Sequence, residues 1–195
     1  MIEPPFFSVI VPTYNRQQAL KDLLTCLIAQ DYSPDRFEII IVDDGSTDGT
    51  LAMVKPQVEA GEFVLLTQEH LGPGIARNKG AEIARGDVLV FTDSDCLPEP
   101  GWLSALAQAY TIPDGNGSVA VGGPIRNLPG GSWLRRFQAR RERDHVANQH
   151  PSPLYLDTAN ASFLKAAFFS VGGFRPACTW SEDVDLGFRL RKAGI

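Results

Sequence analysis

Two short acidic clusters follow apolar segments and could hold a divalent cation. Asp93-Ser94-Asp95 comes directly after the apolar segment 87–92, and Asp43-Asp44-Gly45-Ser46 follows the apolar segment 37–42. Carboxylate oxygens select hard cations such as Mg²⁺ or Mn²⁺, which usually bridge to substrate phosphates. Each cluster alone also fits a turn that aspartate stabilises. In the second cluster one acid is expected to serve the turn, which leaves Asp44 to accept hydrogen bonds from a nucleobase or a ribose.

The stretch from His70 to Gly80 combines glycines, a helix start and cationic side chains. Gly72-Pro73-Gly74 precedes a helical pattern at about 75–84, and Arg77 stands one turn inside it. Because a helix N-terminus favours anions, Arg77 could reach a nucleobase or a diphosphate. The spacing matches neither the G-x-x-x-x-G-K-[ST] loop nor G-x-G-x-x-G, so neither of these phosphate-binding loops is predicted.

A further acidic pair, Glu182-Asp183, follows Trp180 and Ser181. The pattern is typical of a helix start that Ser181 caps. The functional alternative is that one of the two acids is a general base, which must be ionised at the working pH. A helix N-terminus lowers the pKa of a carboxylate, whereas the neighbouring like charge raises it.

Short apolar segments alternate with helical patterns along the first half of the chain. They predict buried strands at residues 6–12, 37–42, 63–66 and 87–92. Leucines spaced i, i+3, i+4 and i+7 predict a helix capped by Asn15, and Ser46 or Thr47 is expected to cap the next one. A helix at 102–110 and a strand at 118–122 follow.

This alternation predicts an α/β fold with a mainly parallel sheet and helices on both faces. Ligands of such sheets bind beyond the carboxyl ends of the strands. The segments 12–15, 43–46 and 93–95 should therefore meet at one edge of the sheet, around a cleft that holds four carboxylates.

Length and charge agree with one acidic globular domain. The chain has 195 residues and a net charge of −5. An acidic chain is a poor partner for nucleic acid, whose phosphates need a basic surface. Three scattered cysteines indicate reduced thiols rather than a disulfide framework. With no basic and apolar leader at the start and no run of about 18 apolar residues, we expect a cytoplasmic protein.

Taken together, the motifs resemble the family 2 glycosyltransferases, which have the GT-A fold. Four segments fall in the order of that family. They are FSVIVPTYNR (7–16), IIIVDDGSTDGT (39–50), GPGIARNKGAEIARGDVLVFTDSD (72–95), and NASFLKAAFFSVGGFRP with WSEDVDLGFRLRKAG (160–194). The resemblance implies a single Rossmann-like GT-A catalytic domain over 1–195, with a donor half at about 1–123 and an acceptor half at about 124–195.

The resemblance also implies a nucleoside-diphosphate-sugar donor, a UDP-sugar before others, and a Mn²⁺ or Mg²⁺ cofactor. Asp44 would contact the base, Arg77 the base or the diphosphate, and Asp93 the ribose. The residues implied for donor binding are Pro12, Thr13, Tyr14, Asp44, Arg77, Asp93 and Ser94.

The metal and the acceptor are assigned in the same way. Asp93 and Asp95 would ligate the metal that bridges the two phosphates. Asp183 would be the general base that deprotonates the acceptor hydroxyl, with Glu182 and Trp180 beside the acceptor. The implied reaction is one in-line displacement at the anomeric carbon, which inverts an α-linked donor into a β-linked product.

The sequence departs from the family pattern at its end. It stops at Ile195, where family members continue with further strands, often with a late metal-binding histidine, and processive synthases add Q-x-x-R-W. We therefore expect a chain truncated at the C-terminus. A non-catalytic nucleotide-sugar binding module, or an inactive fragment, is the alternative function. A haloacid-dehalogenase-type phosphatase is disfavoured because its D-x-D follows the first strand, and a sugar-nucleotide pyrophosphorylase because PTYNRQQAL has no glycine.

The charge inverts between Arg126 and His150, where six arginines outnumber Glu142 and Asp144. A solvated helical face explains this best. The alternative is peripheral contact of the segment 126–150 with anionic lipid or an acceptor, which would place the protein at the inner face of the membrane. A saccharide, a lipid-linked saccharide and a protein are all compatible acceptors.

Overall fold

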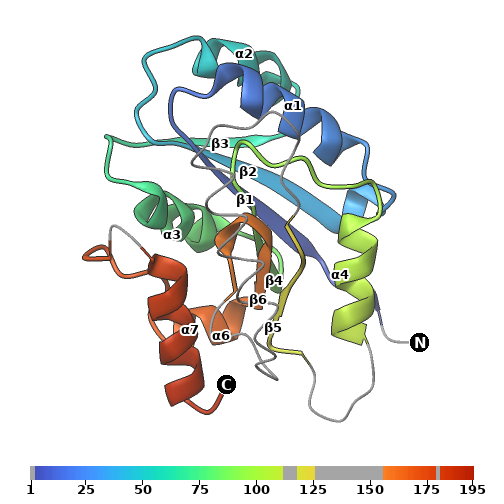
Figure 1. The fold of residues 1–195 in the computed structure, drawn as a ribbon. Coiled ribbons are helices and arrows are strands. Elements are labelled where there is room, and N and C mark those ends of the chain that lie inside the picture. The colour runs from blue at the N-terminus through green and yellow to red at the C-terminus, as the bar shows by residue number, and fades with distance from the viewer. Residues whose placement is uncertain (1–2, 112–117, 126–155, 179–180) are drawn as a thin grey trace.

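The computed structural model describes residues 3–111, 118–125, 156–178 and 181–195. Their strands form one six-stranded sheet in the order β3-β2-β1-β4-β6-β5 (Figure 1). The strands are β1 (Phe7–Thr13), β2 (Phe37–Asp43), β3 (Val64–Thr67), β4 (Val88–Phe91), β5 (Ala120–Gly122) and β6 (Ala161–Leu164). β3, β2, β1 and β4 run parallel, as the sequence predicts, whereas β6 is antiparallel to both β4 and β5.

Helices cover both faces of the sheet, which confirms the predicted α/β class. On one face, β1 and β2 side chains pack with α1 (Gln17–Ile28), α2 (Thr50–Glu59) and α4 (Trp102–Thr111). On the other face, α3 (Pro73–Ile83), α6 (Lys165–Ser170) and α7 (Glu182–Lys192) cover the strands. Successive residues of β1 are buried on opposite faces, which explains why the strand is continuously apolar.

The approach of α3 to the sheet depends on a glycine. A Cβ added to Gly80 would lie 2.6 Å from Ile10 Cγ2, whereas one added to Gly74 on the same helix would meet nothing closer than 3.7 Å. Without a side chain at Gly80, the α3 backbone can pack directly on β1. This packing fixes the position of Arg77, one turn away along α3.

Two predicted helix caps are wrong. Arg16, not Asn15, is the N-cap of α1, and Gly49, not Ser46 or Thr47, is the N-cap of α2. Asn15 instead joins two loops, as described below. Ser181 does occupy the N-cap of α7, but its backbone is left-handed and its side chain makes no capping hydrogen bond.

Two other expectations concern contact with a membrane. Among the described residues, no helix is long and apolar enough to cross a membrane. The arginine-rich segment 126–150 lies outside the described residues, so its predicted helical face and its contact with lipid remain predictions.

Candidate active site

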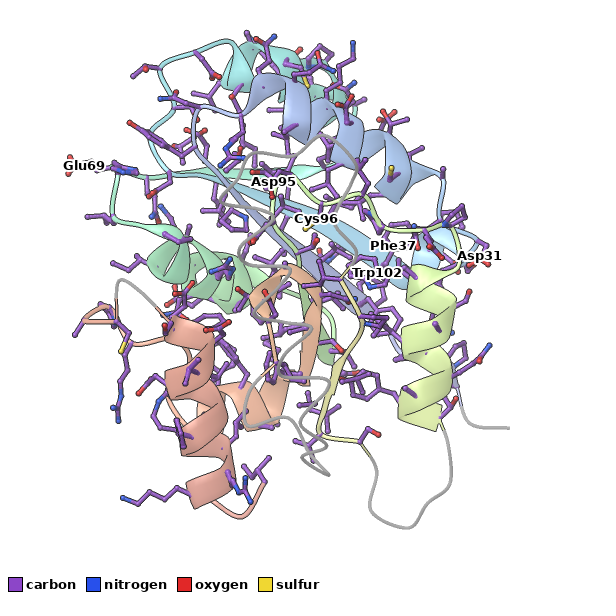
Figure 2. All side chains as sticks on the ribbon, viewed as in Figure 1. Asp31, Phe37, Glu69, Asp95, Cys96 and Trp102 are labelled. Atoms are coloured by element: carbon purple, nitrogen blue, oxygen red, sulfur yellow. The ribbon has the colours of Figure 1, made fainter. Side chains whose placement is uncertain are left out.

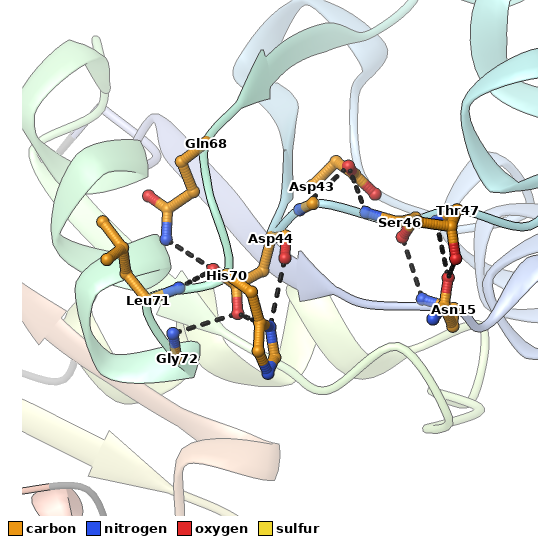
Figure 3. A network of polar contacts seen from close by, with 10 residues as sticks. Asn15, Asp43, Asp44, Ser46, Thr47, Gln68, His70, Leu71 and Gly72 are labelled. Atoms are coloured by element: carbon orange, nitrogen blue, oxygen red, sulfur yellow. Dashed lines mark hydrogen bonds and ion pairs between the residues drawn. The ribbon is translucent and has the colours of Figure 1, made fainter.

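The loop after β1 and the loop after β2 are joined by Asn15 (Figure 3). Its side-chain oxygen accepts hydrogen bonds from the backbone N–H of Thr47 at 2.7 Å and of Asp48 at 3.2 Å. In return, its own N–H donates to Ser46 Oγ at 2.8 Å. Asn15 has a φ of +50°, a conformation that asparagine tolerates better than most residues. The two loops are therefore held as one edge.

The two aspartates at the end of β2, Asp43 and Asp44, have separate partners, as the sequence predicts. Asp43 serves the turn, because its Oδ2 accepts from the N–H groups of Gly45 and Ser46. Asp44 instead reaches the segment before α3. Its Oδ1 accepts from Leu71 N at 2.9 Å and from Gln68 Nε2 at 2.7 Å.

The second oxygen of the Asp44 carboxylate is engaged by the same segment. Asp44 Oδ2 accepts from Gly72 N at 3.0 Å and lies 2.9 Å from His70 Nδ1 (Figure 3). The Asp44 side chain is 4% exposed. In this structure Asp44 thus sets the loop that begins α3, and its predicted contact with a nucleobase remains a prediction.

Three residues that are expected to lie along the nucleotide, Pro12, Thr13 and Tyr14, stand at the end of β1. Pro12 and Thr13 are buried, whereas Tyr14 is partly exposed and stacks on His70 with ring centroids 3.9 Å apart. Two buried oxygens, Thr13 Oγ1 and Asp43 Oδ1, have no hydrogen-bond partner among the described residues. Sequence reasoning did not single out His70 as a partner of Tyr14, and only the fold brings the two rings together.

Asp93, Ser94 and Asp95 follow β4, at the same edge of the sheet (Asp95 and Cys96 are labelled in Figure 2). Ser94 is buried. Burial, together with the negative charges of Asp93 and Asp95, raises the pKa of the Cys96 thiol to about 11. Asp93 and Asp95 therefore both lie close enough to the Cys96 thiol to act on it.

Each of these two carboxylates contacts an arginine. Asp95 Oδ2 lies 2.7 Å from Arg16 Nη1, and Asp93 Oδ1 lies 2.5 Å from Arg77 Nη2. Sequence reasoning did not single out Arg16, which stands 79 residues before Asp95.

An oxygen-only pair such as Asp93 and Asp95 fits a Mn²⁺ or Mg²⁺ ion, because these ions are usually held by one or two carboxylates plus substrate phosphates. Within the described ranges, no group of three or more His, Cys, Asp or Glu side chains is placed to hold a metal by itself.

Arg77 joins the loop 93–95, the candidate metal loop, to the acidic first turn of α7. Its Nη1 lies 2.6 Å from Glu182 Oε1, while its Nη2 contacts Asp93. The structure thus brings together three residues to which the resemblance gives different roles: Arg77 for the donor, Asp93 for the metal and Glu182 for the acceptor. The Arg77 side chain is only 3% exposed, and its contact with a base or a diphosphate remains a prediction.

Asp183 stands beside Glu182 in the first turn of α7 and accepts from the N–H of Val184 at 2.8 Å. Burial, with smaller effects from the charges of Asp157 and Glu182, raises its pKa above the ordinary aspartate value. From the sequence, the helix start and the neighbouring charge are opposing influences on this pKa, and burial cannot be predicted. In the structure, burial is the largest cause. Trp180 lies outside the described residues.

The amino-acid sequence matches a known protein family. The family model described as Glycosyl transferase family 2 matches residues 8–175. Validoxylamine A glucosyltransferase of Streptomyces hygroscopicus subsp. limoneus is 32% identical, over 98% of this chain and 49% of its own length.

Solved structures agree. The mannosyltransferase PcManGT from Pyrobaculum calidifontis, in complex with GDP-Man and Mn²⁺, aligns with a TM-score of 0.78 and 25% identity over 98% of this chain and 53% of its own. S. aureus TarS 1–349 aligns with a TM-score of 0.71 and 25% identity, over 95% of this chain and 55% of its own. The chain spans about half the length of these relatives, and the six-stranded sheet is that of GT-A glycosyltransferases. The chain belongs to glycosyltransferase family 2.

Proposed function

We propose that this chain transfers a sugar from a nucleoside-diphosphate sugar to an acceptor hydroxyl, by a metal-assisted single displacement that inverts the anomeric centre. The observation that carries this proposal is the contact of Arg77 with both Asp93 and Glu182. It sets the candidate metal loop beside the helix start that bears Asp183. The GDP-Man and Mn²⁺ present in the PcManGT complex support a nucleotide-sugar donor and a divalent cation here.

Asp183 is the proposed general base. Its carboxylate takes the proton of the acceptor hydroxyl while the acceptor oxygen bonds to the anomeric carbon and the bond to the diphosphate breaks. A raised pKa makes this carboxylate a stronger base as long as it remains ionised. Because the base and the leaving group stand on opposite faces of the sugar, the product is inverted.

The remaining residues bind and orient the reactants. Pro12, Thr13 and Tyr14 line the strand ends along which the nucleotide would lie. A Mn²⁺ or Mg²⁺ ion held by Asp93 and Asp95 would offset the charge that grows on the departing diphosphate. Glu182 and Trp180 are proposed to face an acceptor, which can be a saccharide, a lipid-linked saccharide or a protein.

Release of nucleoside diphosphate tests the proposal. The chain is incubated with Mn²⁺ and a panel of UDP- and GDP-sugars, with and without simple saccharide acceptors. We expect release that falls about 10²–10⁴-fold in Asp183→Asn, because the general base is lost. Binding of the nucleoside diphosphate should stay unchanged in that variant.

Asp22→Asn, an exposed change of the same kind on α1, is the control and should leave release intact. Equal release by Asp183→Asn would contradict its role as the base. Binding of the donor without release by the unsubstituted chain would favour a non-catalytic binding module.

A further inference from the structure

The guanidinium of Arg77 is shared between two carboxylates from distant parts of the chain. Asp93 follows β4, and Glu182 begins α7, 105 residues after Arg77. The distances are 2.5 Å and 2.6 Å, one from each terminal nitrogen. Three elements, α3, the end of β4 and the start of α7, therefore meet on one side chain.

Burial raises the energetic importance of the contact between Arg77 and its two carboxylates. The Arg77 side chain is 3% exposed, and its Nε has no hydrogen-bond partner among the described residues. The guanidinium carbon lies 5.8 Å from the centre of the Phe174 ring. A buried cation needs its anionic partners, and the partners need the cation, because an unpaired buried charge is costly. A change at one carboxylate must therefore alter how strongly Arg77 holds the other.

We propose that Arg77 is a positioning residue that couples the loop 93–95 to the acceptor side, and that it does so through Asp93 and Glu182. The coupling rests on the proposed function for its use in catalysis. Its physical basis is already present in the ligand-free protein. The guanidinium of Arg77 shares its positive charge between Asp93 and Glu182, and this sharing leaves Asp93 able to bind a cation.

The geometry also predicts what lysine would do at this position. A planar guanidinium offers separate nitrogens to two carboxylates, whereas an ammonium is a single point charge. Arg77→Lys should keep a buried cation but weaken the link between the two acids. Arg77→Met should remove the link altogether.

The first test uses the ligand-free chain. Backbone amide NMR spectra are compared for Glu182→Gln in the wild-type and Arg77→Met backgrounds. We expect Glu182→Gln to shift the amide signals of residues 93–96 when Arg77 is present and to leave them nearly unshifted when it is absent. Equal shifts in both backgrounds would overturn the coupling. If Arg77→Met does not fold, Arg77→Lys replaces it, with the shifts expected to be reduced.

The second test measures the affinity for Mn²⁺ alone. When Glu182 is neutralised, Arg77 is left with Asp93 and competes more strongly with the metal. We expect Glu182→Gln to weaken Mn²⁺ binding about three- to tenfold in the wild-type background, and by less than about twofold with Arg77→Met. A merely structural role for Arg77 would not produce this dependence in folded variants.

Asp183→Asn is the matched control, because it removes the same charge one residue further on while its carboxylate contacts Val184 N. Its effect on Mn²⁺ affinity should be the same in both backgrounds. Equal effects of Glu182→Gln in both backgrounds would overturn the inference. Failure of the wild-type chain to bind Mn²⁺ or any nucleoside diphosphate would instead overturn the proposed function, and the NMR comparison would still decide the coupling.

Discussion

The pKa of Asp183 determines the pH range in which the proposed base works. Burial is the main cause of the raised pKa, and the negative charge of Asp157 adds to it. A base is active when ionised, so the rate should fall as the pH drops through this pKa. The acid limb of kcat/KM is therefore expected at a higher pH than for an ordinary aspartate.

Asp157→Asn tests this cause. The substitution removes a negative charge but keeps the Oδ1 that accepts from Ala159 N. The pKa of Asp183 should fall, and the acid limb should move to lower pH. The exposed Asp22→Asn variant should leave the limb where it is. A limb that does not respond to Asp157→Asn would show that this charge does not reach the base.

The residue types of the site could be predicted from sequence, but their partners could not. Acids after strand ends and at a helix start are visible as local motifs. The pairs that decide their state join residues far apart in the chain, such as Arg77 with Glu182 and Arg16 with Asp95. Asp44 could be selected as the free acid of its pair, yet its four neighbours in the segment 68–72 became visible only in the fold.

At the scale of elements, the contact between α3 and β1 gives a clear prediction. Gly80→Ala places a methyl group against Ile10, and overpacking of this kind costs about 1–3 kcal/mol. Better helix propensity offsets about 1 kcal/mol of that. We expect a net loss of stability in urea unfolding, together with slower turnover because Arg77 is displaced.

Gly74→Ala is the control on the same helix, since its added methyl group meets only ordinary contacts. It should be neutral or slightly stabilising. If both variants were equally stable, the close approach of α3 to the sheet would not be a constraint.

The parallel part of the sheet could be predicted because β1, β2 and β4 are almost wholly buried and therefore continuously apolar, while β3 is partly buried and still apolar over three residues. β6 was not predicted, because four residues carry too little periodicity and its antiparallel pairing depends on β4 and β5. The two wrong caps share a different cause. Asn15 and Ser46 form hydrogen bonds across two loops, and these tertiary partners outweigh local capping preference.

At the scale of the whole molecule, ligand binding should appear as added thermal stability. A nucleoside diphosphate present at about 100 times its Kd contributes about 2.7 kcal/mol. For a chain of this size, that corresponds to a rise in Tm of about 5–10 °C. We expect this rise in Tm with Mn²⁺ present and a smaller rise without it. The nucleoside diphosphate that gives the larger rise, UDP or GDP, identifies the donor class.

Asp95→Asn should reduce the part of that rise that depends on Mn²⁺. Arg191→Ala also changes one charge, but in the last turn of α7, at the opposite end of that helix from Glu182 and Asp183, so it serves as the control. A rise of equal size with and without Mn²⁺ would contradict a shared metal and diphosphate site.

The antiparallel entry of β6 has a consequence for the length of the connection that precedes it. The backbone leaves the sheet at Gly123, whose N–H donates to Asn160 O, and Leu156 packs where Gly122 leaves room. The point where the chain leaves β5 therefore lies beside the point where it enters β6, at the edge of the sheet that also carries Asp157 and Asp93. Closing a longer connection between fixed neighbours costs little additional entropy. A change in the length of this connection is therefore expected to leave the hydrogen-bonded pairing of β5 with β6 in register.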